Sequence, residues 1–411
     1  MPLPHDNVSP KKSRRVAVLG YSVRSLAEAV SDLGYEVLAI DHFNDQDTSL
    51  VAQCVSIPNW PQGIDEVIQR NAIDTVLLAG GMENLPELVS SLCDRGLLQG
   101  MDRTSLLACR SIESLRQLVH GTGINFPESR DCKPRVDPAK WIWKPYASSG
   151  GLGIRSAVDT SDNPFGYWQK FIQGSSIGVY FVIFPDGPQY CGATESLSGE
   201  DWPGPKPMIY RGSLGPIDLP ESYVSDLTEL AMRIYSSTNY RGWLQMDLVE
   251  TTDAQLYLLE INPRWTAGME ILRIAELTNM ARLHLQAIRF DSTTSLESLK
   301  NHSHWAAKAI FYAPHELRFW FDSKAEFIRH AMTRLKQDPT CHRYEVEADI
   351  ADIPHVDQVF LPEQPVFTVR TRFAHRVNLD WQSARQILLA ALKEIQPACS
   401  QAVCAILGKT Q

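Results

Sequence analysis

Residues 245–264, QMDLVETTDAQLYLLEINPR, contain two apolar runs separated by a polar turn at 251–254. Both runs are short and bounded by turn residues, so they predict two strands that pair as a hairpin. Side chains repeat every second residue along a strand, which places Glu260 and Asn262 on one face. Asp247 on the paired strand can face them. Two carboxylates and an amide oxygen suit magnesium held together with phosphates. Arg264, on the same side, can neutralise phosphoryl charge.

A solvated hairpin face with a surface Asp and Glu is the alternative explanation for this stretch. An apolar strand that contains Glu-Ile-Asn-Pro-Arg at 260–264 is an unusual way to build a solvated face. The sequence therefore favours a functional site on the hairpin.

A glycine-rich segment lies upstream at 141–154, WIWKPYASSGGLGI. It predicts a strand that ends in Lys144 and continues into a loop of small residues. Glycines let backbone N–H groups approach an anion closely, and the lysine adds a point charge. No Gly-Lys-Ser/Thr closes the loop, so it is not a Walker A loop. Taken alone, this segment is better explained as a mobile glycine loop with an incidental lysine.

The segment QKFIQG at 169–174 has two interpretations. It is typical of a strand edge followed by a turn. An apolar pair beside exposed backbone can also hold a flat adenine, with main-chain groups contacting the edge of the base.

The first hundred residues alternate apolar runs with helical patterns, which predicts a parallel sheet with crossover helices. Arg24, Asp41 and Glu83 follow apparent strands of this sheet, at the edge where open α/β sheets bind ligands. Taken singly, each of them is better explained as a loop, cap or solvated residue. An NAD-dependent Rossmann oxidoreductase is excluded, because Gly20 is followed by Tyr-Ser-Val-Arg-Ser and not by the later glycines of the dinucleotide turn.

The bulk properties limit the class of protein. A chain of 411 residues is long enough for two or three packed units. The net charge of -9 argues against binding a nucleic-acid backbone. No run reaches the roughly 18 apolar residues of a membrane span. The polar segment up to Arg15 lacks the apolar stretch of a secretory signal, and the eight cysteines contain no CxxC pair. We therefore expect a cytoplasmic protein with reduced thiols.

The motifs occur together in an order that resembles the ATP-grasp superfamily, which includes biotin carboxylase and D-alanine–D-alanine ligase. Residues 260–264 are similar to the ExNPR motif of that superfamily, and Asp247 precedes Glu260 by 13 positions (260 − 247), as in its paired metal carboxylates. Within the superfamily, segments 20–24, 41–48 and 210–216 resemble the predicted carboligases related to biotin carboxylase. Two departures stand out: Gln169, where many relatives have Glu, and Gln245, where peptide-ligase relatives have Arg.

The resemblance implies an α/β (α+β) architecture, the ATP-grasp fold. We expect a disordered lead-in at 1–15 and a Rossmann-like pre-ATP-grasp domain at 16–115. An ATP-grasp domain would follow at 116–290, with a lid subdomain at about 140–195. A small C-terminal α+β lobe would complete the chain at 300–411.

The resemblance also implies a ligase that activates a small-molecule carboxylate with ATP, through an acyl phosphate, and passes it to an amine or another nucleophile. The implied cofactors are ATP and Mg²⁺, with Mn²⁺ able to replace the magnesium. The implied site comprises metal ligands (Asp247, Glu260, Asn262), catalytic residues (Lys144, Arg264), further nucleotide contacts (Ser148, Ser149, Gly150, Gly151, Gly153, Lys170, Phe171, Ile172) and substrate candidates (Arg24, Asp41, Glu83, Arg211).

Two alternatives stay open. One is a biotin-carboxylase-like carboligase that activates bicarbonate. The other is a non-catalytic, ATP-binding regulatory protein, which would be expected to have lost metal ligands, whereas all three are present here. Neither nucleic acid nor a membrane is an expected partner, and the resemblance is compatible with a homodimer.

Overall fold

The computed structural model describes residues 15–158, 164–199, 201–289, 302–319, 324–376, 378–401 and 403–405. The expected lead-in at 1–15 lies outside these residues, apart from Arg15, which begins the first strand. None of the helices described is long and apolar enough to cross a membrane.

The N-terminal part of the chain forms a four-stranded parallel sheet in the order β3-β2-β1-β4. Near-continuous apolar runs form its central strands, as expected for a sheet covered on both faces. Its elements are β1 (Arg15–Gly20), α1 (Arg24–Ser31), β2 (Glu36–Asp41), η1 (Gln46–Leu50), β3 (Gln53–Val55), α2 (Ile64–Arg70), β4 (Thr75–Leu78) and η2 (Met82–Asn84).

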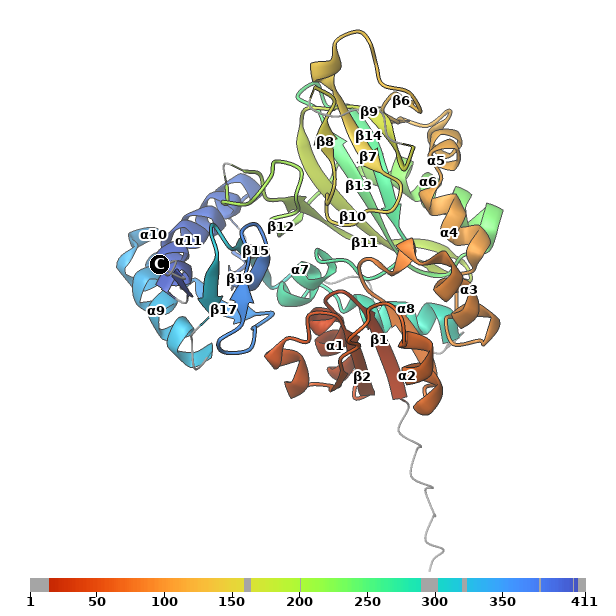
Figure 1. Ribbon diagram of the computed structural model, residues 1–411. Helices are drawn as coiled ribbons and strands as arrows, with labels where there is room; N and C mark the ends of the chain where they lie inside the picture. Colours follow the sequence, from red (N-terminus) through yellow and green to blue (C-terminus); the bar gives the residue numbers. More distant parts are fainter. Residues whose placement is uncertain are drawn as a thin grey trace, which may run out of the picture.

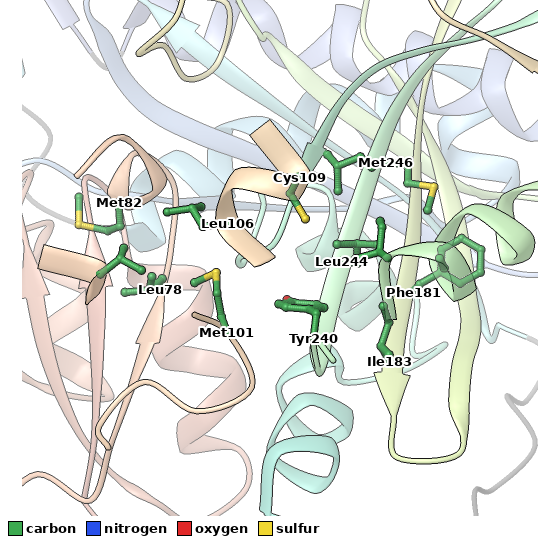
Figure 2. Packing of buried hydrophobic residues seen from close by; sticks show 14 of the residues in the cluster. Leu78, Met82, Met101, Leu106, Cys109, Phe181, Ile183, Tyr240, Leu244 and Met246 are labelled. Atoms are coloured by element: carbon green, nitrogen blue, oxygen red, sulfur yellow. The ribbon is translucent and has the colours of Figure 1, made fainter. Parts of the chain in front are cut away.

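Three helices connect this sheet to the rest of the molecule: α3 (Pro86–Asp94), α4 (Arg103–Arg110) and α5 (Ile112–Val119). Helix α4 begins in a capping box, in which Asp102 accepts from the Ser105 amide at 2.8 Å. Figure 2 shows Leu106 and Cys109 of α4 between Leu78 of the first sheet and Leu244 of the next. One hydrophobic core therefore extends across both parts of the chain.

A nine-stranded sheet dominates the molecule, in the order β17-β19-β15-β12-β11-β10-β13-β14-β5. The pairing of β12 with β15, in which Gly212 lies opposite Ala309, continues this sheet into the C-terminal lobe. Its strands are β5 (Ile124–Asn125), β10 (Ser175–Phe184), β11 (Gly187–Ser196), β12 (Gly212–Ile217), β13 (Gly242–Glu250), β14 (Leu256–Asn262), β15 (His304–Tyr312), β17 (Glu347–Ala351) and β19 (Pro365–Ala374).

A separate four-stranded sheet, β6-β9-β7-β8, lies at the top of Figure 1. It consists of β6 (Ser129–Arg130), β7 (Trp141–Pro145), β8 (Arg155–Ser156) and β9 (Gly166–Lys170), with η3 (Pro138–Lys140) before β7. Strands β7, β8 and β9 of this sheet belong to the first half of the segment expected to form the lid, 140–195. The second half, in β10 and β11, belongs to the large sheet.

The remaining helices pack on the large sheet or belong to the C-terminal lobe. That lobe lies on the left of Figure 1. These helices are α6 (Glu221–Thr238), α7 (Met269–Ile274), α8 (Met280–Arg289), α9 (Lys324–Gln337), α10 (Pro339–Arg343) and α11 (Trp381–Gln401). A fourth, three-stranded sheet pairs β16 (Leu317–Phe319) with β18 (Val359–Phe360) and β20 (Val403–Ala405).

A buried ion cluster joins the N-terminal sheet to the C-terminal lobe. Arg24 of α1 forms a hydrogen-bonded ion pair with Glu270 of α7 and a second with Asp352, with Nε 2.8 Å from Oδ1. Glu270 is fully buried and also contacts Lys308 at 2.5 Å and Arg370 at 3.1 Å. Removing one member of such a cluster leaves an uncompensated buried charge, so these pairs hold the parts of the chain in one arrangement.

Candidate active site

The β13–β14 hairpin brings the proposed metal ligands together. Asp247 pairs directly with Glu260, and Gln245 with Asn262, with a β-bulge after Asp247. The Asn262 amide nitrogen donates to Asp247 Oδ2 at 2.8 Å and to Glu260 Oε1 at 3.2 Å. Both carboxylates and the amide therefore lie on one face, as the strand alternation predicts.

The two carboxylates carry opposite pKa shifts. Burial, and then the charge of Glu260, raise the pKa of Asp247 well above its usual range. Burial also acts to raise the pKa of Glu260, but Lys144 and Arg110 outweigh it and lower that pKa to about 2. Two carboxylates opposed in a buried site repel each other, and a divalent cation offsets that repulsion.

Arg264 links three parts of the chain. Its guanidinium lies 2.7 Å from the Glu83 carboxylate, which follows the N-terminal sheet. The same group donates to Asn262 Oδ1 at 3.0 Å and to Ser149 of the glycine loop at 3.4 Å. The two side chains of the ion pair are only 9% and 1% exposed. Arg264 is therefore held in place by fixed partners before any ligand binds.

Lys144 is the last residue but one of strand β7, beside the glycine loop. Its ammonium group donates to Gln169 Oε1 at 3.3 Å, and Gln169 in turn donates to Ser129 at 3.2 Å. The side-chain amide at position 169 thus accepts from the lysine as a carboxylate would, although without its negative charge. This geometry gives a role to a residue that departs from the motif of many relatives.

The glycine loop packs against the segment that precedes β12. Gly150 accepts from the Tyr210 amide at 3.0 Å, and a Cβ atom on Gly151 would lie 1.8 Å from the Met208 carbonyl oxygen. Gly151 and Gly153 both have a φ of 81°, in the left-handed region that favours glycine. Two independent constraints, space and backbone conformation, therefore require glycine at position 151.

The expected adenine segment connects the two sheets. Strand β9 ends at Lys170, and the Phe171 amide donates to the Lys140 carbonyl at 2.8 Å. Phe171 is 43% exposed, and Gly174 passes close to the carbonyl of Glu250 at the end of β13. A partly exposed apolar side chain thus lies between the small sheet and the large one.

Arg110 and Asn84 were not identified from the sequence. Arg110 of α4 donates to the Ser148 carbonyl at 3.4 Å and to Asn84 Oδ1 at 3.2 Å. Asn84 donates to the same carbonyl at 3.3 Å. The guanidinium also contributes to the low pKa of Glu260. Neither residue belongs to a recognisable motif, although Asn84 directly follows Glu83.

The four substrate candidates occupy different places. Glu83 contacts Arg264 of the site. Arg24 lies in the buried ion cluster, and Asp41 is fully buried, where it accepts from the amides of Phe43 and Val23. Arg211 donates to the carbonyls of Trp202 and Lys206, at 3.3 and 3.2 Å, and so holds a loop together.

The fold is that of the ATP-grasp proteins. Residues 112–268 match the family model described as the ATP-grasp domain. The chain therefore contains an ATP-grasp domain, and the expected fold is confirmed. No curated protein matches the sequence.

Several solved structures share the fold along most of the chain. The L-amino acid ligase from Bacillus licheniformis is 14% identical, with a TM-score of 0.67 over 93% of this chain and 97% of that one. The N5-carboxyaminoimidazole ribonucleotide synthetase from Thermus thermophilus is 15% identical, with a TM-score of 0.64 over 95% and 99%. The biotin carboxylase domain of the Hydrogenobacter thermophilus 2-oxoglutarate carboxylase, in complex with MgADP, ADP and bicarbonate, is 12% identical, with a TM-score of 0.65 over 92% and 89%.

Proposed function

We propose that the chain is an ATP-dependent ligase that activates a carboxylate as an acyl phosphate and transfers it to an amine or another nucleophile. The observation that carries the proposal is the convergence of the carboxylate pair, Asp247 and Glu260, with Arg264 and Lys144 beside one glycine loop. This combination of acidic ligands and cations suits a nucleoside triphosphate and its metal ion.

The residues of the hairpin fit a magnesium ion. Asp247 and Glu260 supply hard oxygen ligands, and rotating the Asn262 amide would present its oxygen as a third. When bound, the ion would neutralise charge on the terminal phosphates. The fit rests on the two opposed carboxylates on one face of the hairpin; burial, and then the charge of Glu260, raise the pKa of Asp247.

The cationic groups have separate tasks in this mechanism. Lys144, oriented by Gln169, and the backbone N–H groups of the loop 148–153 would hold the phosphates. Arg264, anchored by Glu83, would stabilise charge on the γ-phosphoryl group as it passes to the substrate carboxylate. The nucleophile then attacks the acyl phosphate and phosphate leaves. Closure of the glycine loop would exclude water from that intermediate.

A bicarbonate-activating carboligase is the second candidate. It is favoured by the structural likeness to a biotin carboxylase domain with bound bicarbonate and to N5-carboxyaminoimidazole ribonucleotide synthetases. In this reaction the activated acid would be bicarbonate, and Arg264 and Lys144 would keep the same roles.

A hydroxylamine trap tests both candidates. Protein, Mg-ATP and hydroxylamine are incubated with a panel of carboxylic acids, and hydroxamate and phosphate are measured. Hydroxamate formed with one acid, and abolished in Glu260→Gln, supports the ligase. Bicarbonate-dependent phosphate release without hydroxamate supports the carboligase instead.

The matched control is Glu87→Gln, since the Glu87 side chain is 84% exposed and remote from the hairpin in sequence. It should leave turnover unchanged. If Glu260→Gln retains full turnover, the metal-site assignment is wrong. If ATP binds but no acid or bicarbonate stimulates phosphate release, the chain is a non-catalytic ATP-binding protein.

A further inference from the structure

Four ring-bearing side chains gather at the carboxyl edge of the N-terminal sheet: Tyr21, His42, Phe43 and Trp60. We call them the aromatic edge. Ring centroids of Tyr21 lie 5.3 Å from His42 and 5.5 Å from Trp60, and those of His42 lie 5.4 Å from Phe43. The side chains come from the loops after β1 and β2 and from the segment before α2, so they are brought together only by the fold.

The aromatic edge is accessible. Tyr21 and Phe43 are 43% and 42% exposed, and His42 is also exposed. The interplanar angles among the four rings are 52° to 72°, so no pair is stacked face to face. Trp60 is half-buried, so the exposed part of the aromatic edge consists of adjoining rings that a planar ligand could contact.

Backbone hydrogen bonds hold the loops of the aromatic edge in place. The Tyr21 amide donates to the Gly80 carbonyl at 3.3 Å, and the Phe43 amide donates to the Tyr21 carbonyl at 3.2 Å. The His42 amide donates to the Gly20 carbonyl at 3.3 Å. These bonds order the rings before a ligand arrives, which lowers the entropic cost of binding.

The aromatic edge adjoins the phosphoryl-transfer site. A Cβ atom on Gly81 would lie 2.2 Å from the Tyr21 ring, while one on Gly80 would lie 3.7 Å from Ser149 Oγ and 3.8 Å from the Arg264 guanidinium. Consecutive Cα atoms are only about 3.8 Å apart. The Tyr21 ring and the Arg264 guanidinium therefore lie against two consecutive glycines, and the aromatic edge borders the arginine of the candidate site.

We infer that the aromatic edge binds a planar aryl or heteroaryl group of the substrate, whose reacting carboxylate or amine then lies beside Arg264. The inference rests on the proposed function, because it uses Arg264 as the centre of the reaction. A planar ring binds to aromatic side chains more tightly than a saturated ring of the same size does, since a planar ring can lie flat on their faces or meet them edge on. The carboxyl end of a parallel sheet is also where open α/β folds bind ligands.

The test compares flat and saturated rings of equal size. The probes are phenylacetate against cyclohexylacetate, for a ring on the acid, and benzylamine against cyclohexylmethylamine, for a ring on the nucleophile. Binding to the full chain is measured by saturation-transfer NMR with and without MgADP, and MgADP binding is measured separately by calorimetry. We expect one phenyl probe to bind at least about threefold more tightly than its cyclohexyl counterpart.

Two variants replace a ring with an apolar side chain, Phe43→Leu and Tyr21→Leu. Each should weaken the preferred phenyl probe about threefold to tenfold and leave its saturated counterpart within about twofold. The control is Leu50→Ala, at a 79% exposed apolar residue of the same domain, which should change neither.

The inference is overturned if phenyl and cyclohexyl probes bind equally, if both leucine variants keep the phenyl preference, or if Leu50→Ala abolishes it. These outcomes are independent of MgADP binding. A chain that binds MgADP but shows no ring preference refutes only the aromatic edge, whereas a chain that binds no MgADP refutes the proposed function.

Discussion

The ion pair between Arg264 and Glu83 allows stability and catalysis to be separated. In Arg264→Met, the apolar stem of the side chain is kept while its charge is lost. Glu83 is then left as an unpaired buried carboxylate, because apart from the ion pair with Arg264 neither of its oxygens has a hydrogen-bond partner in the part of the chain that the structure describes. Breaking a buried pair in this way costs about 3–5 kcal/mol, and we expect the free energy of unfolding to fall by that amount.

A second substitution, Glu83→Gln, identifies the source of the loss. In the Arg264→Met background it replaces the unpaired carboxylate with a neutral amide of similar shape, so the double variant should be more stable than Arg264→Met alone, by about 1 kcal/mol or more. In the wild-type background the same substitution removes a partner of Arg264 and should destabilise. Glu83→Gln should therefore raise the free energy of unfolding when residue 264 is methionine and lower it when residue 264 is arginine.

Two assays are needed. Unfolding in urea, followed by tryptophan fluorescence, gives the four stabilities of the cycle. The hydroxamate assay gives the rates, and here neither the single Arg264→Met variant nor the double variant should recover, because loss of one charge-stabilising donor lowers kcat about 10²–10³-fold. If Glu83→Gln destabilises the Arg264→Met variant as much as it destabilises the wild type, the two residues are not coupled and the reasoning fails.

Two other predictions concern the glycine loop and acid stability. Gly151→Ala should lower turnover much more than Gly96→Ala. Both positions have positive φ, but a new Cβ at position 96 has nothing within 4 Å, whereas one at position 151 would lie 1.8 Å from the Met208 carbonyl oxygen. Equal losses of turnover in the hydroxamate assay would show that this close contact is irrelevant. His284, whose Nδ1 accepts from the Trp243 amide at 3.1 Å, has its pKa lowered by burial to about 3. The folded state disfavours its protonation, so its contribution is complete above the unfolded pKa of about 6.5 and is lost as the pH falls below that value, by about 2 kcal/mol at pH 5. Urea unfolding between pH 8 and 5 should show this loss in the wild type and not in His284→Gln, and an identical slope in both would contradict it.

The sequence was most informative where an argument needed only neighbouring residues. Strand alternation predicted that Asp247, Glu260 and Asn262 share one face, and the structure has them hydrogen-bonded on one hairpin. The strand that ends in Lys144 and its glycine loop were predicted for the same reason. These features depend on the period of the backbone and on the conformational freedom of glycine, which are local properties.

Tertiary structure decided which distant side chains meet. Arg110 and Ser148 lie 38 positions apart, and Arg264 and Glu83 belong to different parts of the chain, so no periodicity relates either pair. Arg24 is the opposite case. It follows a strand of the N-terminal sheet, as the sequence predicted, yet its guanidinium is bound by Glu270 and Asp352, 246 and 328 positions away.

The amino-acid sequence by itself thus determined the class of fold, the hairpin of acidic residues and the glycine loop, because hydrophobic periodicity and backbone conformation act over a few residues. Only the packing of the sheets decided that Glu83 anchors Arg264, that Arg24 stabilises the arrangement of the domains, and that four aromatic side chains meet beside the site. Their partners are specified by burial and charge in three dimensions, and the same residue type serves structure or chemistry according to what surrounds it.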